Sequence, residues 1–222
     1  MMPSWASSMR VVKQGAESFV LEGSFLGMKA IFKLRVPKAY MDPSLDRSLR
    51  FERTMKEAKV LATAYRAGVN VPRVLAVYPS MGLIVMELIE GPTLKEVIDT
   101  GGPWRDLAVE AGRQVGLLHR AGIVHGDTTT SNMIVRGGAV YLIDFGLADF
   151  SLSPEDRAVD VHLLREAVTS THPSIAEELY SLFLKGYESA LGHEAAKVVA
   201  ERARAVEMRG RYVASRRTVW RG

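Results

Sequence analysis

Two polar motifs in the second half of the chain constrain its fold more than any other feature. HGDTTTSN spans residues 125–132, and IDFG spans residues 143–146. The pattern around them predicts a loop after a helix, then two short strands, the second of which ends at Asp144. Asp127 and Asn132 stand five residues apart on this loop. We therefore expect these three side chains to converge on one site.

The residue types of this site suit phosphoryl transfer. One carboxylate orients the attacking hydroxyl, while a carboxylate and an amide hold the metal ions that bridge the phosphates. Hard oxygen ligands of this kind favour Mg²⁺. The alternative is that HGD forms a polar turn and DFG a strand end, but it leaves the order and context of the two motifs unexplained.

A lysine within an apolar strand is the second informative feature. Lys33 ends the run AIFK, and burial of its charge is costly unless a partner neutralises it. The phosphates of ATP and a carboxylate of the following helix would supply that partner. Glu57 is the candidate carboxylate, and Glu52, five residues earlier on another helix face, is its competitor. The alternative is an edge-strand lysine that points to solvent.

Two further segments occupy positions where a nucleotide would meet the backbone. The loop QGAES at residues 14–18 has a single glycine, and its amides would cap phosphates unless it is an ordinary β-turn. The strand end near residue 87 would hydrogen-bond an adenine, although apolar residues at a strand end are usually core. The candidate nucleotide contacts are Gly15, Ala16, Glu17, Met86, Glu87 and Ile89.

The order of the predicted elements indicates an α+β chain with two lobes. Five strands and one helix, at residues 46–67, are followed by a mainly helical part. Gly91 and Pro92 mark the linker, and Thr93 is a suitable helix N-cap. The predicted organisation is a disordered extension over residues 1–8, an N-lobe over residues 9–89, a C-lobe over residues 90–208 and a basic tail over residues 209–222.

Composition excludes several classes of protein. The 222 residues contain no cysteine, which excludes disulfides and favours a reducing cytoplasm. No stretch reaches the roughly 18 apolar residues of a membrane span, and MMPSWASS lacks the features of a signal peptide. From Arg202 onward, seven arginines accompany one glutamate, so this segment carries +6 while the whole chain carries +4. The five arginines from residue 209 onward, with Tyr212 and Trp220, predict binding of a nucleic acid or, alternatively, a solvated tail.

The motifs resemble those of the protein-kinase superfamily over residues 9–208. KLRVPKAYMDPSLD at residues 33–46 and EDRAVDVHLLREA at residues 155–167 are similar to the small atypical kinases of the KEOPS complex, the PRPK family. The resemblance implies a bilobal protein-kinase-like fold that uses ATP and Mg²⁺. The roles it implies are phosphate binding by Lys33, support of Lys33 by Glu57, catalytic base for Asp127, metal binding by Asn132 and Asp144, and bracing of the catalytic loop by Asp160.

The resemblance also implies a function and partners. It indicates an atypical serine/threonine kinase and ATPase that autophosphorylates and supports threonylcarbamoyladenosine modification of tRNA. A threonylcarbamoyltransferase subunit would bind the C-lobe, a small regulatory subunit the N-lobe, and tRNA the basic tail. For Asp160, a surface acid on a helix is the alternative interpretation.

Two absences narrow the prediction. HGD lacks the arginine of the common H-R-D motif, and seven residues between Gly146 and Pro154 leave no room for a long activation segment. We therefore expect an enzyme without broad peptide specificity that is permanently assembled or switched by a partner. The alternatives are a RIO-like kinase of ribosome maturation, a small-molecule phosphotransferase with an HGD motif, and a non-enzymatic scaffold.

Overall fold

The computed structural model describes residues 9–15 and 17–219, with side chains up to Met208. The chain forms two compact units. One comprises the residues up to Arg66 together with Val71–Glu90, and the other comprises Ala67–Asn70 together with the residues from Gly91 onward. Within the described ranges, no helix is long and apolar enough to cross a membrane.

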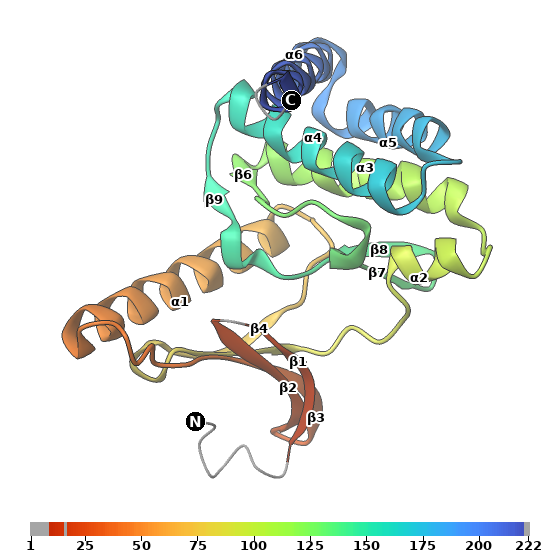
Figure 1. The fold of residues 1–222 in the computed structure, drawn as a ribbon. Helices are drawn as coiled ribbons and strands as arrows, with labels where there is room; N and C mark the ends of the chain where they lie inside the picture. Colours follow the sequence, from red (N-terminus) through yellow and green to blue (C-terminus); the bar gives the residue numbers. More distant parts are fainter. Residues whose placement is uncertain (1–8, 16, 220–222) are drawn as a thin grey trace. The chain divides into compact units, whose positions relative to one another are not determined.

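The first unit is built on a five-stranded antiparallel sheet with the order β1-β2-β3-β5-β4 (Figure 1). Along the third strand, Ala30, Phe32 and Leu34 join the buried core, while Lys33 and Arg35 belong to the opposite face. The sheet therefore carries an apolar side and a charged side. Its strands are β1 (Arg10–Gln14), β2 (Ser18–Phe25), β3 (Met28–Arg35), β4 (Val74–Tyr78) and β5 (Leu83–Glu87).

Helix α1 (Pro43–Arg66) contacts β4 and β5. It begins one turn before the predicted start at residue 46, because Asp42 caps it. The Asp42 carboxylate accepts hydrogen bonds from the backbone N–H groups of Ser44 at 2.9 Å and Leu45 at 3.1 Å. A short 3₁₀ turn, η2 (Pro79–Met81), connects β4 to β5.

The second unit is mainly helical. Its most extensive helix packing is between α3 and α5, which lie side by side in Figure 1. A Cβ on Gly112 of α3 would lie 1.8 Å from the Phe183 carbonyl oxygen of α5, so only glycine permits this approach. The helices are α2 (Leu94–Asp99), α3 (Trp104–Arg120), α4 (Pro154–Thr171), α5 (Ala176–Leu191) and α6 (His193–Val219). The last helix thus continues through residues 209–219.

Two small sheets carry the polar motifs of this unit. The two short strands β7 (Met133–Arg136) and β8 (Ala139–Leu142) were predicted, and they pair as a hairpin, whereas the pairing of β6 (Ile123–Val124) with β9 (Asp149–Phe150) was not predicted. Two 3₁₀ turns, η3 (Thr130–Asn132) and η4 (Phe145–Leu147), lie in the motifs themselves. The predicted α+β class, with a five-stranded sheet, one helix and a helical C-terminal part, is confirmed.

Candidate active site

A buried lysine and its carboxylate partner lie in the first unit. Nζ of Lys33, on β3, donates to Oε1 of Glu57, on α1, at 2.7 Å, and the two side chains are 8% and 2% exposed. Nη2 of Arg35 donates to the other carboxylate oxygen at 2.6 Å. Glu52 is exposed and accepts a hydrogen bond from Ser48. Of the two candidate partners, the structure therefore pairs Lys33 with Glu57.

Arg35 was not among the predicted site residues. A signal for it existed, because residues two apart on a strand share one face of the sheet. With Arg35, two buried cations share the carboxylate of Glu57. Burial of charges costs several kcal/mol per ion unless they are paired. The shared carboxylate therefore holds both cations in place, where they could act on an anionic ligand such as the phosphates of ATP.

Three of the predicted nucleotide contacts lie in the loop between β1 and β2. The Gly15 N–H donates to the Ser18 carbonyl at 2.9 Å and closes a tight turn. Ala16 lies outside the described residues. The half-exposed Glu17 carboxylate accepts from Lys38 at 2.5 Å and from Arg53 at 2.8 Å. The hydrogen bond from Lys38 lowers the pKa of Glu17 most strongly, so Glu17 is charged at neutral pH.

The strand-end residues are more buried than the loop. Met86 is buried on β5, and Ile89 is buried just beyond it. The Glu87 N–H donates to the Arg73 carbonyl at 2.9 Å, and its carboxylate accepts from Nε of Arg73 at 3.1 Å. A nucleotide hydrogen bond at the Glu87 backbone is therefore restricted to the carbonyl oxygen.

In the second unit, Asp160 of α4 holds the loop that begins at His125. Its carboxylate accepts from the N–H groups of His125 at 2.5 Å and Gly126 at 2.7 Å, and from Nε2 of His119 at 3.0 Å. Burial acts to raise the pKa of Asp160, but the hydrogen bonds from His119 and His125 outweigh it and lower the pKa. The prediction that Asp160 braces this loop, and is not a surface acid, is confirmed.

His125 links the loop to the DFG motif. Its ring packs against Phe145, with 4.7 Å between centroids, and Nε2 lies 3.1 Å from the Ile143 carbonyl. Burial lowers the pKa of His125. Because Nδ1 accepts the Asp127 N–H at 3.3 Å, the hydrogen bonds assign the neutral ring with its proton on Nε2. One buried imidazole thus ties together the backbone of both polar motifs.

The three predicted polar residues of this unit come together. Nδ2 of Asn132 donates to the Asp127 carboxylate at 2.7 Å and to the Asp127 carbonyl at 3.0 Å. The Asn132 carbonyl accepts the Ile143 N–H at 2.9 Å, which brings the next residue, Asp144, beside the loop. Asp144 has a left-handed backbone with φ of 63°. Such conformations cluster at functional sites, and aspartate tolerates them better than most residues.

The donor set fits a hard divalent cation. The amide nitrogen of Asn132 points to Asp127, so the Asn132 amide oxygen and the Asp144 carboxylate are the groups that would hold Mg²⁺. Within the described part of the chain, no group of three or more His, Asp or Glu side chains is arranged to hold a metal. Mg²⁺ is usually bound through one or two carboxylates together with substrate phosphates, which is the kind of ligand set that Asn132 and Asp144 offer.

A loop that carries Asp127 and Asn132 beside a strand-end Asp144, in a chain with a buried lysine–glutamate pair, defines the protein-kinase-like class. A solved Rio2 kinase from Chaetomium thermophilum, in complex with ADP, Mg²⁺ and phosphoaspartate, shares this fold. It has a TM-score of 0.62 and 16% identity, over 91% of this chain and 70% of that one. The RIO domain family model matches residues 34–151.

Curated relatives define the family more closely. The KEOPS complex subunit Bud32 of Pyrococcus abyssi is 46% identical over 92% of this chain and 96% of its own. A probable serine/threonine-protein kinase Bud32 homologue of Archaeoglobus fulgidus is 43% identical over 82% and 88%. A probable bifunctional tRNA threonylcarbamoyladenosine biosynthesis protein of Methanothermobacter thermautotrophicus is 38% identical over 91% of this chain but only 36% of its own length. The chain belongs to the Bud32 family of atypical kinases.

Proposed function

We propose that this protein is an ATP-dependent kinase and ATPase that supports threonylcarbamoyladenosine modification of tRNA as a subunit of a KEOPS complex. The observation that carries the proposal is the hydrogen-bonded pair of Asp127 and Asn132 beside Asp144. These residues provide a base and two oxygen ligands for a metal. Phosphoryl transfer needs both of these elements and little other chemistry from the protein.

The proposed roles follow from the surroundings of each group. Bound Mg²⁺ would neutralise charge on the β- and γ-phosphates. Asn132 and Asp144 would hold the metal, and Asp127 would orient the attacking hydroxyl or water. Lys33, fixed by Glu57, would contact the phosphates. The proposal requires one nucleotide to engage groups of both units.

The remaining nucleotide contacts are also proposals. Backbone amides near Gly15 would face the phosphates, with Ala16 and Glu17 beside them. The adenine would meet backbone groups at Met86 and Ile89 and, because the Glu87 N–H is already used, the Glu87 carbonyl oxygen. A tight turn or a strand end can present backbone groups in this way without side-chain specificity.

The short segment after DFG supports a restricted choice of acceptor. Asp149 and Phe150 form β9 and pair with β6, and the Ser151 N–H donates to the Gly122 carbonyl at 2.9 Å. The segment is therefore fastened along its length and offers no long platform for a peptide. Autophosphorylation and ATP hydrolysis fit this arrangement better than phosphorylation of many proteins.

The partners belong to the proposal as well. We expect a threonylcarbamoyltransferase subunit on the C-lobe, a small regulatory subunit on the N-lobe and tRNA at the arginine-rich end of α6, all in the cytoplasm. Five arginines beyond Met208 would make tRNA binding strongly dependent on salt. The side chains of this segment lie outside the described residues.

The decisive experiment measures ATP hydrolysis with and without the transferase partner and tRNA. Wild-type protein should be stimulated, and Asp144→Asn should be inactive although it keeps its size and shape. Hydrolysis by Asp144→Asn at the wild-type rate would contradict the mechanism. Absence of stimulation would contradict the assignment to a KEOPS complex. Recovery of ribosomal precursors in a pulldown would favour a RIO-like kinase instead. Hydrolysis that is stimulated by a metabolite would favour a small-molecule phosphotransferase.

A further inference from the structure

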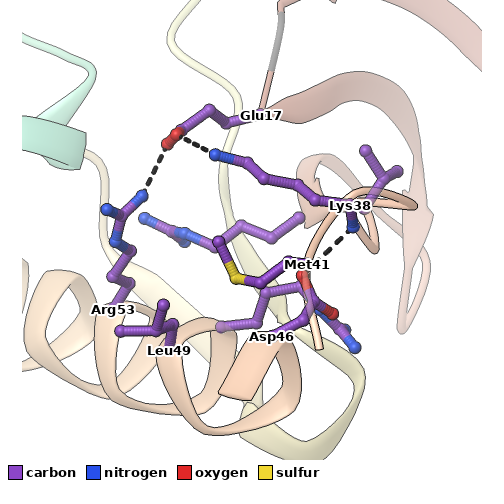
Figure 2. Close-up of a pocket in the computed structure, with 9 residues that line it drawn as sticks. Glu17, Lys38, Met41, Asp46, Leu49 and Arg53 are labelled. Carbon is purple, nitrogen blue, oxygen red and sulfur yellow. Dashed lines mark hydrogen bonds and ion pairs between the residues drawn. The ribbon is translucent and has the colours of Figure 1, made fainter. Parts of the chain in front are cut away.

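A second basic site lies in the first unit, between the segment after β3 and the start of α1. It is a hollow of about 330 Å³, which includes space open to solvent. Figure 2 shows the Glu17 carboxylate between Lys38 and Arg53, with Met41 and Leu49 beside them. Most of the lining comes from the KLRVPKAYMDPSLD segment and the first turns of α1. The lining residues are Glu17, Arg35, Val36, Lys38, Met41, Asp46, Leu49, Arg50 and Arg53.

The charges of the lining are unbalanced. Four cationic side chains accompany two carboxylates, and one of the four, Arg35, is also paired with Glu57, which leaves a surplus of one positive charge. The carboxylates are already engaged: Glu17 with Lys38 and Arg53, and Asp46 with Nε of Arg50 at 2.8 Å. A phosphate group carries about −1.5 to −2 charges at neutral pH, so the surplus charge favours its binding.

A buried nitrogen without a partner provides independent support. Arg35 lines the hollow and is 6% exposed, and its Nη2 donates to Glu57. Its Nη1, however, is buried and makes no hydrogen bond. A buried donor left unsatisfied costs about 1–3 kcal/mol, and more when it is charged. Native proteins rarely retain such a group unless water or an ion completes it.

We propose that this hollow is a binding site for a phosphate group, separate from the nucleotide site. Arg35 supplies the buried donor, and Arg50, Arg53 and Lys38 supply the surrounding charge. Arginine is well suited to this role because its planar guanidinium binds phosphate oxygens in pairs. The phosphate would share Lys38 and Arg53 with Glu17, whose carboxylate lies between them (Figure 2).

Arg35 would connect this site to the nucleotide-binding lysine. One of its terminal nitrogens holds Glu57, which in turn holds Lys33, and the other would bind the phosphate. Occupancy would fix the Arg35 guanidinium on both sides and so stabilise the buried cluster. The site goes beyond the proposed function and does not depend on it, because phosphate binding is measured without hydrolysis.

The test is a titration of the full chain with inorganic phosphate at constant ionic strength, followed by backbone amide shifts in NMR spectra. Magnesium and a non-hydrolysable ATP analogue are present at saturation, so that the phosphate positions of the nucleotide site are filled. We expect saturable shifts at Lys38, Leu49 and Arg53. Linear shifts that chloride reproduces, or saturable shifts only elsewhere in the chain, would overturn the proposal.

Variants locate the site independently. Arg53 is exposed, and the substitution Arg53→Gln removes one charge of the hollow. It should weaken phosphate binding about tenfold, which corresponds to about 1.4 kcal/mol. Arg105→Gln, which removes an exposed, ion-paired arginine of the other unit, is the matched control and should bind as the wild type does. Equal affinity of wild type and Arg53→Gln would refute the site. In a second titration, tighter binding of O-phosphoserine would indicate a phosphate carried on a protein side chain, and weaker binding would indicate free phosphate.

Discussion

Replacement of Glu57 by glutamine tests the buried cluster of the first unit directly. The substitution keeps the size of the side chain but removes its charge, so the two buried cations Lys33 and Arg35 lose the carboxylate that they share. Removal of one partner from a buried ion pair costs about 3–5 kcal/mol. For a chain of this size, 1 kcal/mol shifts the melting temperature by about 2–4 °C, so we expect a decrease of about 6–20 °C.

The assay is thermal unfolding followed by circular dichroism, with Glu52→Gln as the matched control. Glu52 lies on the same helix but is exposed, and its replacement should change the melting temperature by less than about 2 °C, as expected for a surface position. A Glu57→Gln protein whose melting temperature lies within about 2 °C of the wild-type value would refute the reasoning. It would mean that water or another group already compensates the two cations.

A third variant separates stability from function. If Lys33 and Arg35 are replaced by methionine and Glu57 by leucine, the cluster keeps no charge, and such apolar replacements of buried ion pairs are often neutral or stabilising. We therefore expect the melting temperature to recover relative to Glu57→Gln while ATP hydrolysis stays lost. Recovery of both properties would show that the charges of the cluster do not act on the nucleotide.

Much of this unit was accessible to sequence reasoning because its signals are local. Apolar alternation and turn residues predicted the five strands, and a lysine within an apolar run predicted a buried pair with Glu57. The role of Arg35 was accessible too, since it follows from the two-residue period of a strand. The start of α1 was misplaced because the pattern of apolar residues begins after the capping residue Asp42.

Other features depend on contacts that no local pattern contains. The pairing of β6 with β9 joins two-residue strands separated by more than twenty residues. The engagement of Glu17 by Lys38 and Arg53 brings together three segments, so a residue expected near the nucleotide also belongs to a second basic site. The close approach of α3 and α5 at Gly112 was equally hidden, since a glycine within a helix predicts only lower stability.

Three further predictions concern separate parts of the molecule. Asp160→Asn should destabilise the protein by about 3 kcal/mol at pH 7, as expected for lost hydrogen bonds to a charged group. Because the pKa of Asp160 is lowered on folding, this difference should be complete above its ordinary pKa of 3.8 and decrease as the pH falls below that value, in melts from pH 7 to pH 3. Gly112→Ala should cost about 3 kcal/mol in urea unfolding, since its Cβ would overlap the Phe183 carbonyl; an unchanged midpoint would contradict the packing. Lys33→Met should lower kcat for ATP hydrolysis by about 10²–10³-fold, as expected for loss of a phosphate contact, whereas Lys29→Met, at an exposed position of the same strand, should have little effect.

The absence of an arginine in HGD has a structural reason in the second unit. Gly126 has φ of 77°, and a Cβ there would lie 2.6 Å from the Leu147 carbonyl oxygen, so no larger residue fits this backbone. Its N–H donates to Asp160, while the segment beyond Leu147 is fastened through β9 and β6. In kinases with H-R-D, the arginine reads a phosphate on a mobile segment. Here the loop and the short segment are held together by backbone contacts instead. A regulatory phosphate on this segment is therefore unnecessary, and any switch must act through a partner or through another site of the chain.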